Sequence, residues 1–244
     1  MENSKQGIDY EGAWDAYARD WNLLHPELGH IGDEWIGKGA GAAHSLTEYN
    51  AFIERDLIAP YISSDDIVLE IGVGGGKTSS LLLNHCQQLI CADISSNMLE
   101  ATRERLGSDS PTETLRERVS YIKLDGLTLS GIPEAAVDVC FCYDTMVHIE
   151  PRDIFNYLVQ IPKVMRGKRL CVFHHSNILS ELGWQKFGSE WQDNLRGQRH
   201  GCAFSVMTDN IMEKFLTHLN YKVILKDTNS VPRDCIWVCE APLG

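Results

Sequence analysis

The sequence predicts an α/β protein with a doubly wound, mostly parallel sheet of seven strands and helices on both of its faces. From residue 66 onward, short apolar runs typical of buried strands alternate with amphipathic helical patterns, and this alternation indicates βαβ units. Near the C-terminus, the apolar runs YKVILKD and DCIWVCEA flank a polar turn. Such a pair is expected to close one edge of the sheet with antiparallel strands.

Residues 1–60 are expected to form a helical cap or lid. Trp14, Tyr17 and Trp21 share one face of a helix because they are three and four residues apart. The glycine-rich run GHIGDEWIGKGAGAA then predicts an irregular loop. A second helix is expected to begin at the capping-box pattern SLTE and to end near the proline of LIAPYI.

Residues 61–244 are expected to form the ligand-binding core. Its strands are predicted at 66–71, 88–92, 119–123, 137–143, 169–174, 221–227 and 234–241, and its helices at 77–85, 96–106, 151–164 and 208–219. Residues 176–205 make a long connection, and long connections in compact domains are usually functional. We therefore expect 176–205 to be an insertion that binds the substrate.

Composition narrows the range of partners. The chain has 34 acidic and 22 basic residues, a formal net charge of −12. Binding to nucleic acid or to anionic membranes depends largely on cationic side chains, so neither partner is expected. No apolar stretch reaches the ~20 residues of a membrane span. The eight cysteines have no zinc-ligand spacing and several lie in apolar runs. A cytoplasmic protein without a metal site is expected.

The stretch LEIGVGGGKTSSLLL, residues 69 to 83, is a glycine-rich loop that follows a strand. It does not fit a phosphate-binding P-loop, because Ile71 stands where the first glycine of G-x-x-x-x-G-K-[ST] belongs. It fits a dinucleotide fingerprint poorly, because Lys77 replaces the last glycine of G-x-G-x-x-G. Neither nucleotide class is therefore favoured.

Carboxylates at the strand ends favour a cationic ligand instead. Glu70 ends the first predicted strand, where its charge would repel a pyrophosphate and attract a cation. S-adenosylmethionine (SAM) carries an ammonium and a sulfonium and has no phosphate. Asp93 ends the second strand, where a carboxylate can accept both ribose hydroxyls, and Asp125 follows the third. The charge pattern therefore favours SAM over NAD.

Four stretches resemble motifs I to IV of class I SAM-dependent methyltransferases: VLEIGVGGGKTSSLLL, CADISSNMLEATRERL, YIKLDG and VDVCFCYDTMVHIEP. The resemblance runs from about residue 66 to 175. More narrowly, WDAYARDW, GDEW, DTMVHIEP and VFHHSN resemble a bacterial group of small-molecule methyltransferases, often linked to O-methylation of sugars and natural products. The resemblance implies a Rossmann-like fold, SAM as cofactor with S-adenosyl-L-homocysteine as product, and a small-molecule acceptor.

The resemblance also implies which residues bind the donor. Glu70, Gly72, Gly74 and Gly76 would line its methionine end, Asp93 with the adjacent Ile94 would bind the ribose, Asp125 and Gly126 would meet the adenine, and Asp144 would close the methionine side.

Histidines at strand ends are the candidates for catalysis. A hydroxyl acceptor must lose a proton, and histidine titrates in a suitable range for a general base. His148 follows the fourth strand, and His174 and His175 end the fifth. Adjacent residues of a strand point to opposite sides, so at most one of His174 and His175 is expected to face the site. For His148, a role in capping the next helix stays open.

Several further side chains have two open interpretations. The aromatic face of the N-terminal helix is either a packing face or a lid, since aromatic rings stack on adenine and can face a sulfonium. The following residues could contact the donor's ammonium or shape acceptor specificity: Asp33, Glu34, Trp184, Trp191, Arg196 and Arg199.

The sequence thus predicts a SAM-dependent methyltransferase that acts on a small polar metabolite, at the oxygen of a sugar or natural product, as a monomer or homodimer. A protein or peptide methyltransferase, an N-directed enzyme and a non-catalytic SAM-binding protein stay as alternatives. Methylation of nucleic-acid bases is disfavoured, because the fourth strand is followed by DTMV rather than by a D/N-P-P-Y/F sequence.

Overall fold

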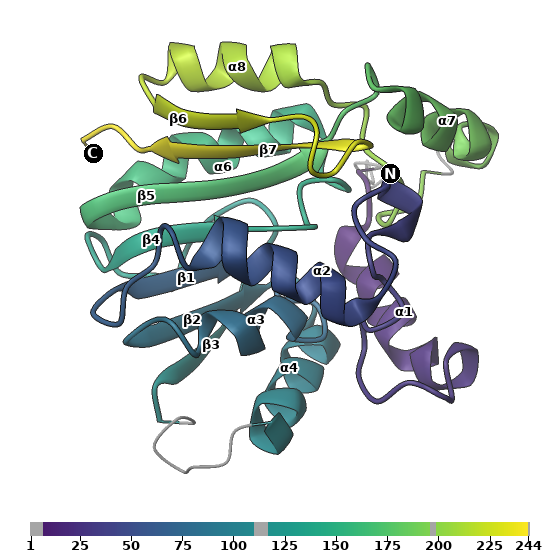
Figure 1. Ribbon diagram of the computed structural model, residues 1–244, viewed down its shortest axis with the longest axis horizontal. Helices are drawn as coiled ribbons and strands as arrows, with labels where there is room; N and C mark the ends of the chain where they lie inside the picture. Colours follow the sequence, from purple (N-terminus) through teal and green to yellow (C-terminus); the bar gives the residue numbers. More distant parts are fainter. Residues whose placement is uncertain (1–6, 110–116, 196–198, 244) are drawn as a thin grey trace, which may run out of the picture.

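The structure is a computed structural model that describes residues 7–109, 117–195 and 199–243. A single sheet, shown in Figure 1, has the strand order β3-β2-β1-β4-β5-β7-β6. The strands are β1 (Ile67–Ile71), β2 (Gln88–Asp93), β3 (Val119–Lys123), β4 (Val137–Cys142), β5 (Met165–Ser176), β6 (Lys222–Asp227) and β7 (Asp234–Glu240). Only β7 is antiparallel to its neighbours. The predicted fold class is confirmed.

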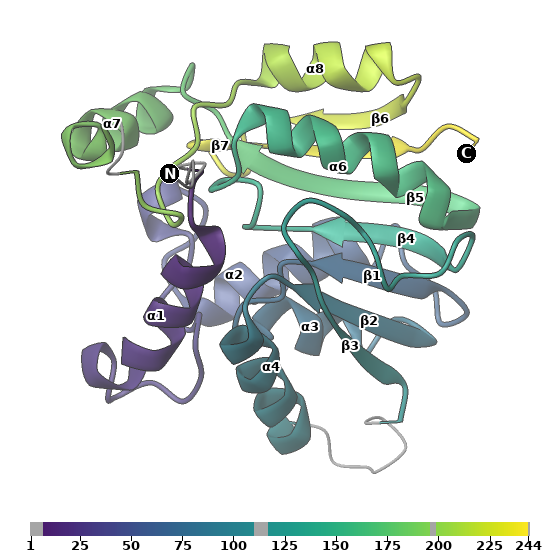
Figure 2. The same ribbon diagram turned by 180° about the vertical axis from the view of Figure 1, so that it is seen from behind.

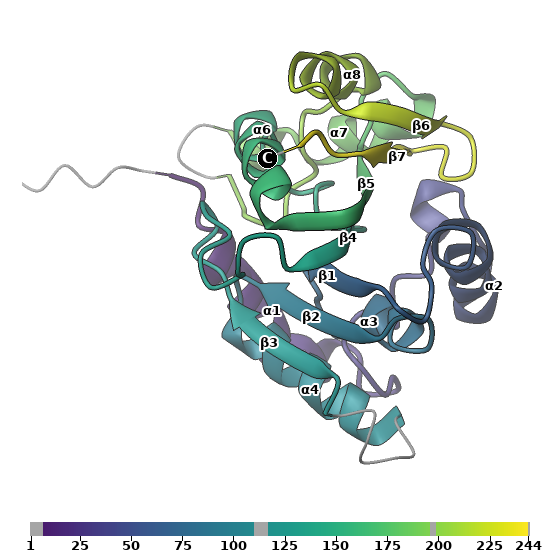
Figure 3. The same cartoon turned by 90° about the vertical axis from the view of Figure 1, so that its left-hand side faces the viewer.

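Helices cover both faces of the sheet. They are α1 (Tyr10–Leu24), η1 (Lys38–Ala40), α2 (Leu46–Phe52), η2 (Ile53–Ile58), α3 (Lys77–Leu82), α4 (Ser96–Asp109), α6 (Pro151–Val164), α7 (Glu181–Glu190), η3 (Gln192–Asn194) and α8 (Asp209–His218). Figures 2 and 3 show α6 and α8 on one side of the twisted sheet, with α2 and α3 on the other. Apolar side chains on opposite faces of the strands thus have helices to pack against.

Each face has its own hydrophobic cluster. Leu158 of α6 and Leu216 of α8 belong to the cluster that also contains Trp237 of β7. On the other face, Ile53 and Leu82 belong to a cluster that includes much of α2, η2 and α3. Buried apolar surface of this kind contributes about 25 cal/mol per Å² to folding, so the two clusters fix the sheet and therefore the strand ends that carry the site.

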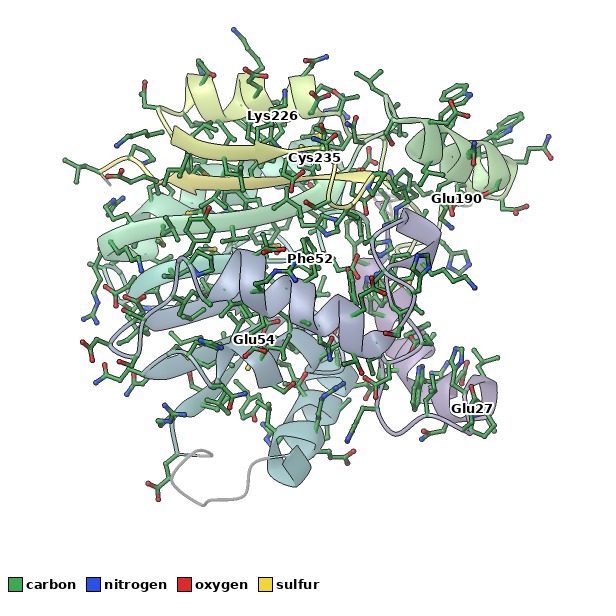
Figure 4. The ribbon with its side chains drawn as sticks, viewed as in Figure 1. Glu27, Phe52, Glu54, Glu190, Lys226 and Cys235 are labelled. Atoms are coloured by element: carbon green, nitrogen blue, oxygen red, sulfur yellow. The ribbon has the colours of Figure 1, made fainter. Side chains whose placement is uncertain are left out.

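Two predicted elements differ from the observed ones. Strand β5 is longer than predicted, because it pairs with β4 at one end and with β7 up to Ser176 at the other. The helix that begins at Ser45, whose Oγ accepts a hydrogen bond from the Glu48 backbone N–H at 3.1 Å, is α-helical only to Phe52. It continues as the π-helical turn η2. Figure 4 labels Phe52 at the end of α2 and Glu54 in η2.

The predicted insertion, 176–205, contains regular structure. It holds α7, which Ser180 caps by accepting a hydrogen bond from the Gly183 N–H at 3.0 Å, and the short helix η3. Figures 1 and 2 both show α7 and α1 at the same end of the sheet. The insertion and the N-terminal segment therefore both lie near the carboxyl ends of the parallel strands.

Candidate active site

A cavity of about 410 Å³ lies at the carboxyl ends of β1, β2 and β4. Its walls come from the loops after these strands, from the N-terminal segment and from the insertion. Open α/β sheets bind ligands at this edge, where parallel strand ends and helix N-termini meet. The cavity is therefore the candidate active site.

Glu70 of β1 lines the cavity and is only 2% exposed. Ser79 of α3 donates a hydrogen bond to its Oε2 at 2.5 Å. Burial raises the pKa of Glu70 to about 8, opposed by the Ser79 hydrogen bond and reinforced by the nearby Asp93. Among the residues that the structure describes, no cationic side chain pairs with Glu70. Because a buried charge is normally paired, the carboxyl offers a place for a cation of the ligand.

The glycines form the turn between β1 and α3. Gly72, Gly74 and Gly76 have φ of 77°, 53° and 80°, a region in which a Cβ is strained. Gly72 also has no room for a Cβ, because the Thr145 side chain lies against it. Gly72 and Gly74 line the cavity, whereas Gly76 is the N-terminal cap of α3 and lies outside its wall.

Asp93 ends β2 and lines the cavity, as does the next residue, Ile94. The backbone N–H groups of Gly74 and Ser95 donate to the two carboxylate oxygens of Asp93 at 3.1 and 2.8 Å. Burial raises the pKa of Asp93 to about 6, against the lowering effect of these hydrogen bonds. Each oxygen retains a lone pair, so the carboxylate can still accept hydrogen bonds from a diol.

Asp125 and Gly126 occupy different positions relative to the cavity. Gly126 lines it, whereas Asp125 is exposed and lies outside its wall. The Asp125 carboxylate accepts hydrogen bonds from the backbone N–H groups of Leu127 and Thr128 at 2.8 and 2.6 Å, which lower its pKa. Aspartate side chains often close a turn in this way, and here the bonds keep Asp125 within its own loop rather than toward the predicted adenine site.

His148 lines the cavity together with Asp144. Nδ1 of His148 lies 3.3 Å from the Ala203 carbonyl oxygen, which can only accept, so Nδ1 carries the proton and Nε2 has the free lone pair. The ring of Trp14 meets the imidazole edge to face at 5.0 Å. Burial lowers the pKa of His148. The side chain is therefore held as a neutral imidazole with an available basic nitrogen.

His174 and His175, both candidates for catalysis in the sequence, do not line the cavity. Both are fully buried. Nε2 of His175 accepts a hydrogen bond from Trp237 Nε1 at 2.9 Å, and its Nδ1 donates to the Ser176 carbonyl at 2.7 Å. With both nitrogens engaged and its pKa lowered to about 4 by burial, His175 is a neutral core residue.

His174 lies behind two residues of the cavity wall, Tyr143 and Asp144. Its Nδ1 accepts a hydrogen bond from the Asp144 backbone N–H at 3.1 Å, and the Tyr143 ring stacks on the imidazole at 4.4 Å. Nε2 lies 3.2 Å from Asp234 Oδ2, but the angle is unsuitable for a hydrogen bond. Asp144 has a φ of 60°, and the bond to His174 stabilises this left-handed conformation.

The aromatic face of α1 is divided between the two interpretations. Tyr10, Trp14 and Tyr17 line the cavity. Trp21 instead packs in the interior, 2% exposed, and its Nε1 donates to Glu34 at 2.9 Å. Part of this face is therefore a wall of the cavity and part is a packing face.

Residues 31–35, here called the strap, cross the glycine loop. Lys77 Nζ donates to the carbonyl oxygens of Gly32 and Trp35 at 3.2 and 2.6 Å, and Gly75 has no room for a Cβ because the Ile31 carbonyl lies against it. Asp33 of the strap, which was expected near the donor, pairs with Arg105. The lysine that resembles a phosphate-binding residue thus binds the strap instead.

The insertion contributes different residues from those expected. Trp184 and Trp191 are 58% and 44% exposed and lie outside the cavity wall, while Lys186 and Cys202 line it. Arg199 forms an ion pair with Glu150, and the predicted Arg196 lies outside the described residues. Lys186 lies in the long connection 176–205 without a ligand motif, so the sequence gave no signal of a binding role.

The part of the chain that the structure describes has no group of three or more His, Cys, Asp or Glu side chains suited to hold a metal ion. In the same residues, no helix combines the length and the apolar character of a membrane span.

Comparison with known proteins points to one enzyme class. Residues 68–168 match the model of a methyltransferase domain family. No curated protein shows a significant sequence match. Many solved structures share the fold. Magnesium protoporphyrin IX methyltransferase from Synechocystis PCC 6803, solved with bound S-adenosyl-L-homocysteine, is 14% identical with a TM-score of 0.64, covering 95% of this chain and 98% of its own.

Two further solved structures with the same fold have similarly low sequence identity to this chain. Geranyl diphosphate C-methyltransferase from Streptomyces coelicolor A3(2) is 9% identical with a TM-score of 0.59, covering 98% of this chain and 100% of its own. A SAM-dependent methyltransferase from Methanosarcina mazei is 15% identical with a TM-score of 0.61, covering 78% of this chain and 98% of its own. Residues 68–168 thus match a methyltransferase domain model, and the chain as a whole shares the Rossmann-like fold of these structures.

Proposed function

We propose that the protein is a SAM-dependent methyltransferase that transfers a methyl group to a hydroxyl oxygen of a small-molecule acceptor, such as a sugar or another natural product. The observation that carries this proposal is one cavity that combines buried strand-end carboxylates with a neutral histidine. The match to a methyltransferase domain and the structures solved with S-adenosyl-L-homocysteine support the donor.

The carboxylates fit the donor by charge and by hydrogen-bonding capacity. Glu70, buried beside the glycine loop, would pair with the ammonium of SAM, and Asp144 would approach the same end. Asp93 would accept the ribose hydroxyls, while Ile94 and Gly126 would contact the adenine. A pyrophosphate would meet Glu70 and Asp93 as like charges, so the same wall disfavours a dinucleotide.

His148 would act as the general base. When bound, SAM supplies a methyl group on a sulfonium, which is transferred by in-line displacement to the attacking oxygen. Nε2 of His148 would accept the proton of the acceptor hydroxyl, because Nδ1–H is already bound to Ala203. The buried His174 and His175 have no access to an acceptor. Most of the remaining acceleration would come from holding the two reactants in line within the cavity.

The substitution His148→Asn tests this role. The asparagine amide nitrogen can replace Nδ1 as donor to Ala203, but the variant lacks Nε2. We expect kcat to fall at least ~10²-fold with the Kd for SAM changed less than twofold, whereas His218→Asn, on the exposed side of α8, leaves both unchanged. Unaltered turnover in His148→Asn would remove the general-base role.

The acceptor class is tested with methyl-labelled SAM and a cell extract separated into metabolite, protein and nucleic-acid fractions. Label in the metabolite fraction is the expected result, the mass of the product identifies the acceptor, and alkaline hydrolysis distinguishes a methyl ester from an ether or amine. Label in the protein fraction would replace the small-molecule acceptor by a peptide. Donor binding without any label would favour a SAM-binding protein that is not an enzyme.

A further inference from the structure

Arg233 is a buried cation in the wall of the cavity. It precedes β7, is 5% exposed and lines the cavity. Its Nε and Nη2 donate to the two oxygens of Asp234 at 2.8 and 2.7 Å. Its guanidinium lies over the rings of Trp35 and Phe204, 4.8 and 5.0 Å from their centres. The side chain is therefore rigid before any ligand binds.

One nitrogen of Arg233 remains unused. No group in the described part of the chain accepts a hydrogen bond from Nη1. Trp35, which also lines the cavity, has a buried Nε1–H without an acceptor. Arginine and tryptophan are donors only, so the group that complements them must be rich in acceptors. Buried donors without partners are rare because each loses its hydrogen bonds to water.

Cationic and anionic side chains both line the cavity around this position. Lys186 of α7 lines the same cavity, and its partner Glu190, labelled in Figure 4, lies 2.9 Å from Nζ on the next turn of α7. Of the nearby carboxylates, Glu34 already accepts hydrogen bonds from Tyr17, Trp21 and a backbone N–H. Asp144 faces the ammonium of SAM in the proposed donor site.

Arg233 also lies within electrostatic range of the proposed base. Its charge and that of Asp144 act on His148 in opposite directions. Arg233 and His148 line the same cavity, so a small acceptor held at Arg233 would share that cavity with the proposed base. The rings of Tyr10 and Trp14 line the space between the N-terminal segment and the base, and they fit a flat or apolar body.

We propose that Arg233 anchors an anionic group of the methyl acceptor, so that the substrate is a small molecule with an apolar or aromatic body and a carboxylate or phosphate. This inference rests on the proposed function, because it names the substrate class of the same cavity. Arginine suits the role, since its planar donors match the oxygens of either group, and Asp234 fixes the fork in place.

Isothermal titration with matched probes tests the proposal on the protein loaded with S-adenosyl-L-homocysteine. Benzoate and phenyl phosphate carry the two anionic groups on one ring, and benzyl alcohol and benzylammonium are the neutral and cationic controls. We expect at least one anion to bind ten-fold or more tightly than both controls. The tighter anion identifies the group as carboxylate or phosphate. Equal binding of benzyl alcohol, or no binding of either anion, would overturn the proposal.

Variants separate anchoring from folding. Arg233→Lys keeps the ion pair with Asp234 and removes Nη1, and we expect it to weaken anion binding at least ten-fold. The double variant Arg233→Met with Asp234→Asn removes both charges together and should behave alike. Arg166→Lys is the matched control, because Arg166 pairs with Asp138 on β4 far from the cavity. Anion affinity within twofold of the wild type in Arg233→Lys would refute the anchor.

The donor titration distinguishes failure of this inference from failure of the proposed function. If S-adenosyl-L-homocysteine does not bind, the proposed function itself fails. If it binds, and the labelled product from the extract is not retained on an anion-exchange resin at neutral pH, only the anionic acceptor is refuted. A retained product that phosphatase releases supports the phosphate form, and a retained, phosphatase-resistant product supports the carboxylate form.

Discussion

The Glu70 carboxyl should destabilise the fold while it serves the donor site. Its pKa rises from 4.5 to about 8 on burial, and at about 1.4 kcal/mol per unit the difference corresponds to ~5 kcal/mol. Below pH 4.5 the carboxyl is neutral in both the folded and the unfolded chain, so its burial has no ionic penalty. As pH rises towards 8, the unfolded chain ionises while the folded chain remains protonated. Stability is therefore lost through this window.

Glu70→Gln removes this penalty and keeps an oxygen that can accept from Ser79. We expect its free energy of unfolding, measured with urea, to exceed that of the wild type by a margin that grows by ~2 to 5 kcal/mol between pH 5 and 9. Glu134→Gln, at an exposed position, should follow the wild-type profile. Parallel profiles for the wild type and Glu70→Gln would refute the reasoning.

The same substitution should remove a pH dependence of donor binding. If SAM pairs with the ionised carboxylate, its affinity for the wild type rises as protons leave Glu70, by up to about thirty-fold between pH 6 and 7.5. In Glu70→Gln the affinity should be weaker and nearly independent of pH over this interval. Titration calorimetry at four pH values measures both slopes. An equal slope in the variant would assign the pH dependence to another group.

Three further substitutions test how the site is built. Lys77→Met removes the bonds that hold the strap, and we expect SAM to dissociate about ten-fold faster in stopped-flow measurements; an unchanged rate would show that the strap does not retain the donor. Gly72→Ala should destabilise the fold by ~2 to 4 kcal/mol in urea unfolding, since the new methyl meets Thr145, whereas Gly74→Ala, with a positive φ but open space, should lose only ~1 kcal/mol; equal losses would contradict the steric account. Asp125→Asn should leave the Kd for SAM within twofold in calorimetry, because its carboxylate serves its own loop; a ten-fold loss would restore the adenine contact.

The sheet and the strand-end residues that line the cavity were predictable from the sequence because both depend on local pattern. Alternating strands and helices determine a parallel sheet, and the residue that ends each strand must lie at its carboxyl edge. The positions of Glu70, Asp93 and Asp144 near the strand ends therefore determine that they lie at this edge. The π-helical turn η2 and the length of β5 were not predictable, because pairing and packing with distant residues decide them.

The histidines show where strand-end reasoning fails. His174 and His175 end a predicted strand, but β5 continues to Ser176 and pairs with β7 on one side, so both side chains are inside the protein. A strand that is central to the sheet buries both alternating faces. His148 differs because β4 stops at Cys142 and the following turn carries it into the cavity wall. The strand that became β5 was predicted to end at residue 174, which is too early. The expectation that adjacent side chains of a strand point in opposite directions is unaffected.

The acceptor side was beyond prediction because it is assembled from segments far apart in the chain. Trp35 of the strap lies under Arg233, which is almost two hundred residues later in the sequence. Arg233 belongs to no motif, and Trp35 ends the stretch GDEW, which gives no indication of a contact with Arg233. Each alone would be taken for a solvated charge or an ordinary packing residue. The ion pair with Asp234 fixes the guanidinium through Nε and Nη2 and leaves Nη1 without an acceptor in the described part of the chain. This unused nitrogen distinguishes Arg233 from a structural arginine. A chain that needed only the ion pair could have buried both charges away from the cavity, so the position of Arg233 in its wall supports recognition of a ligand over structural pairing alone.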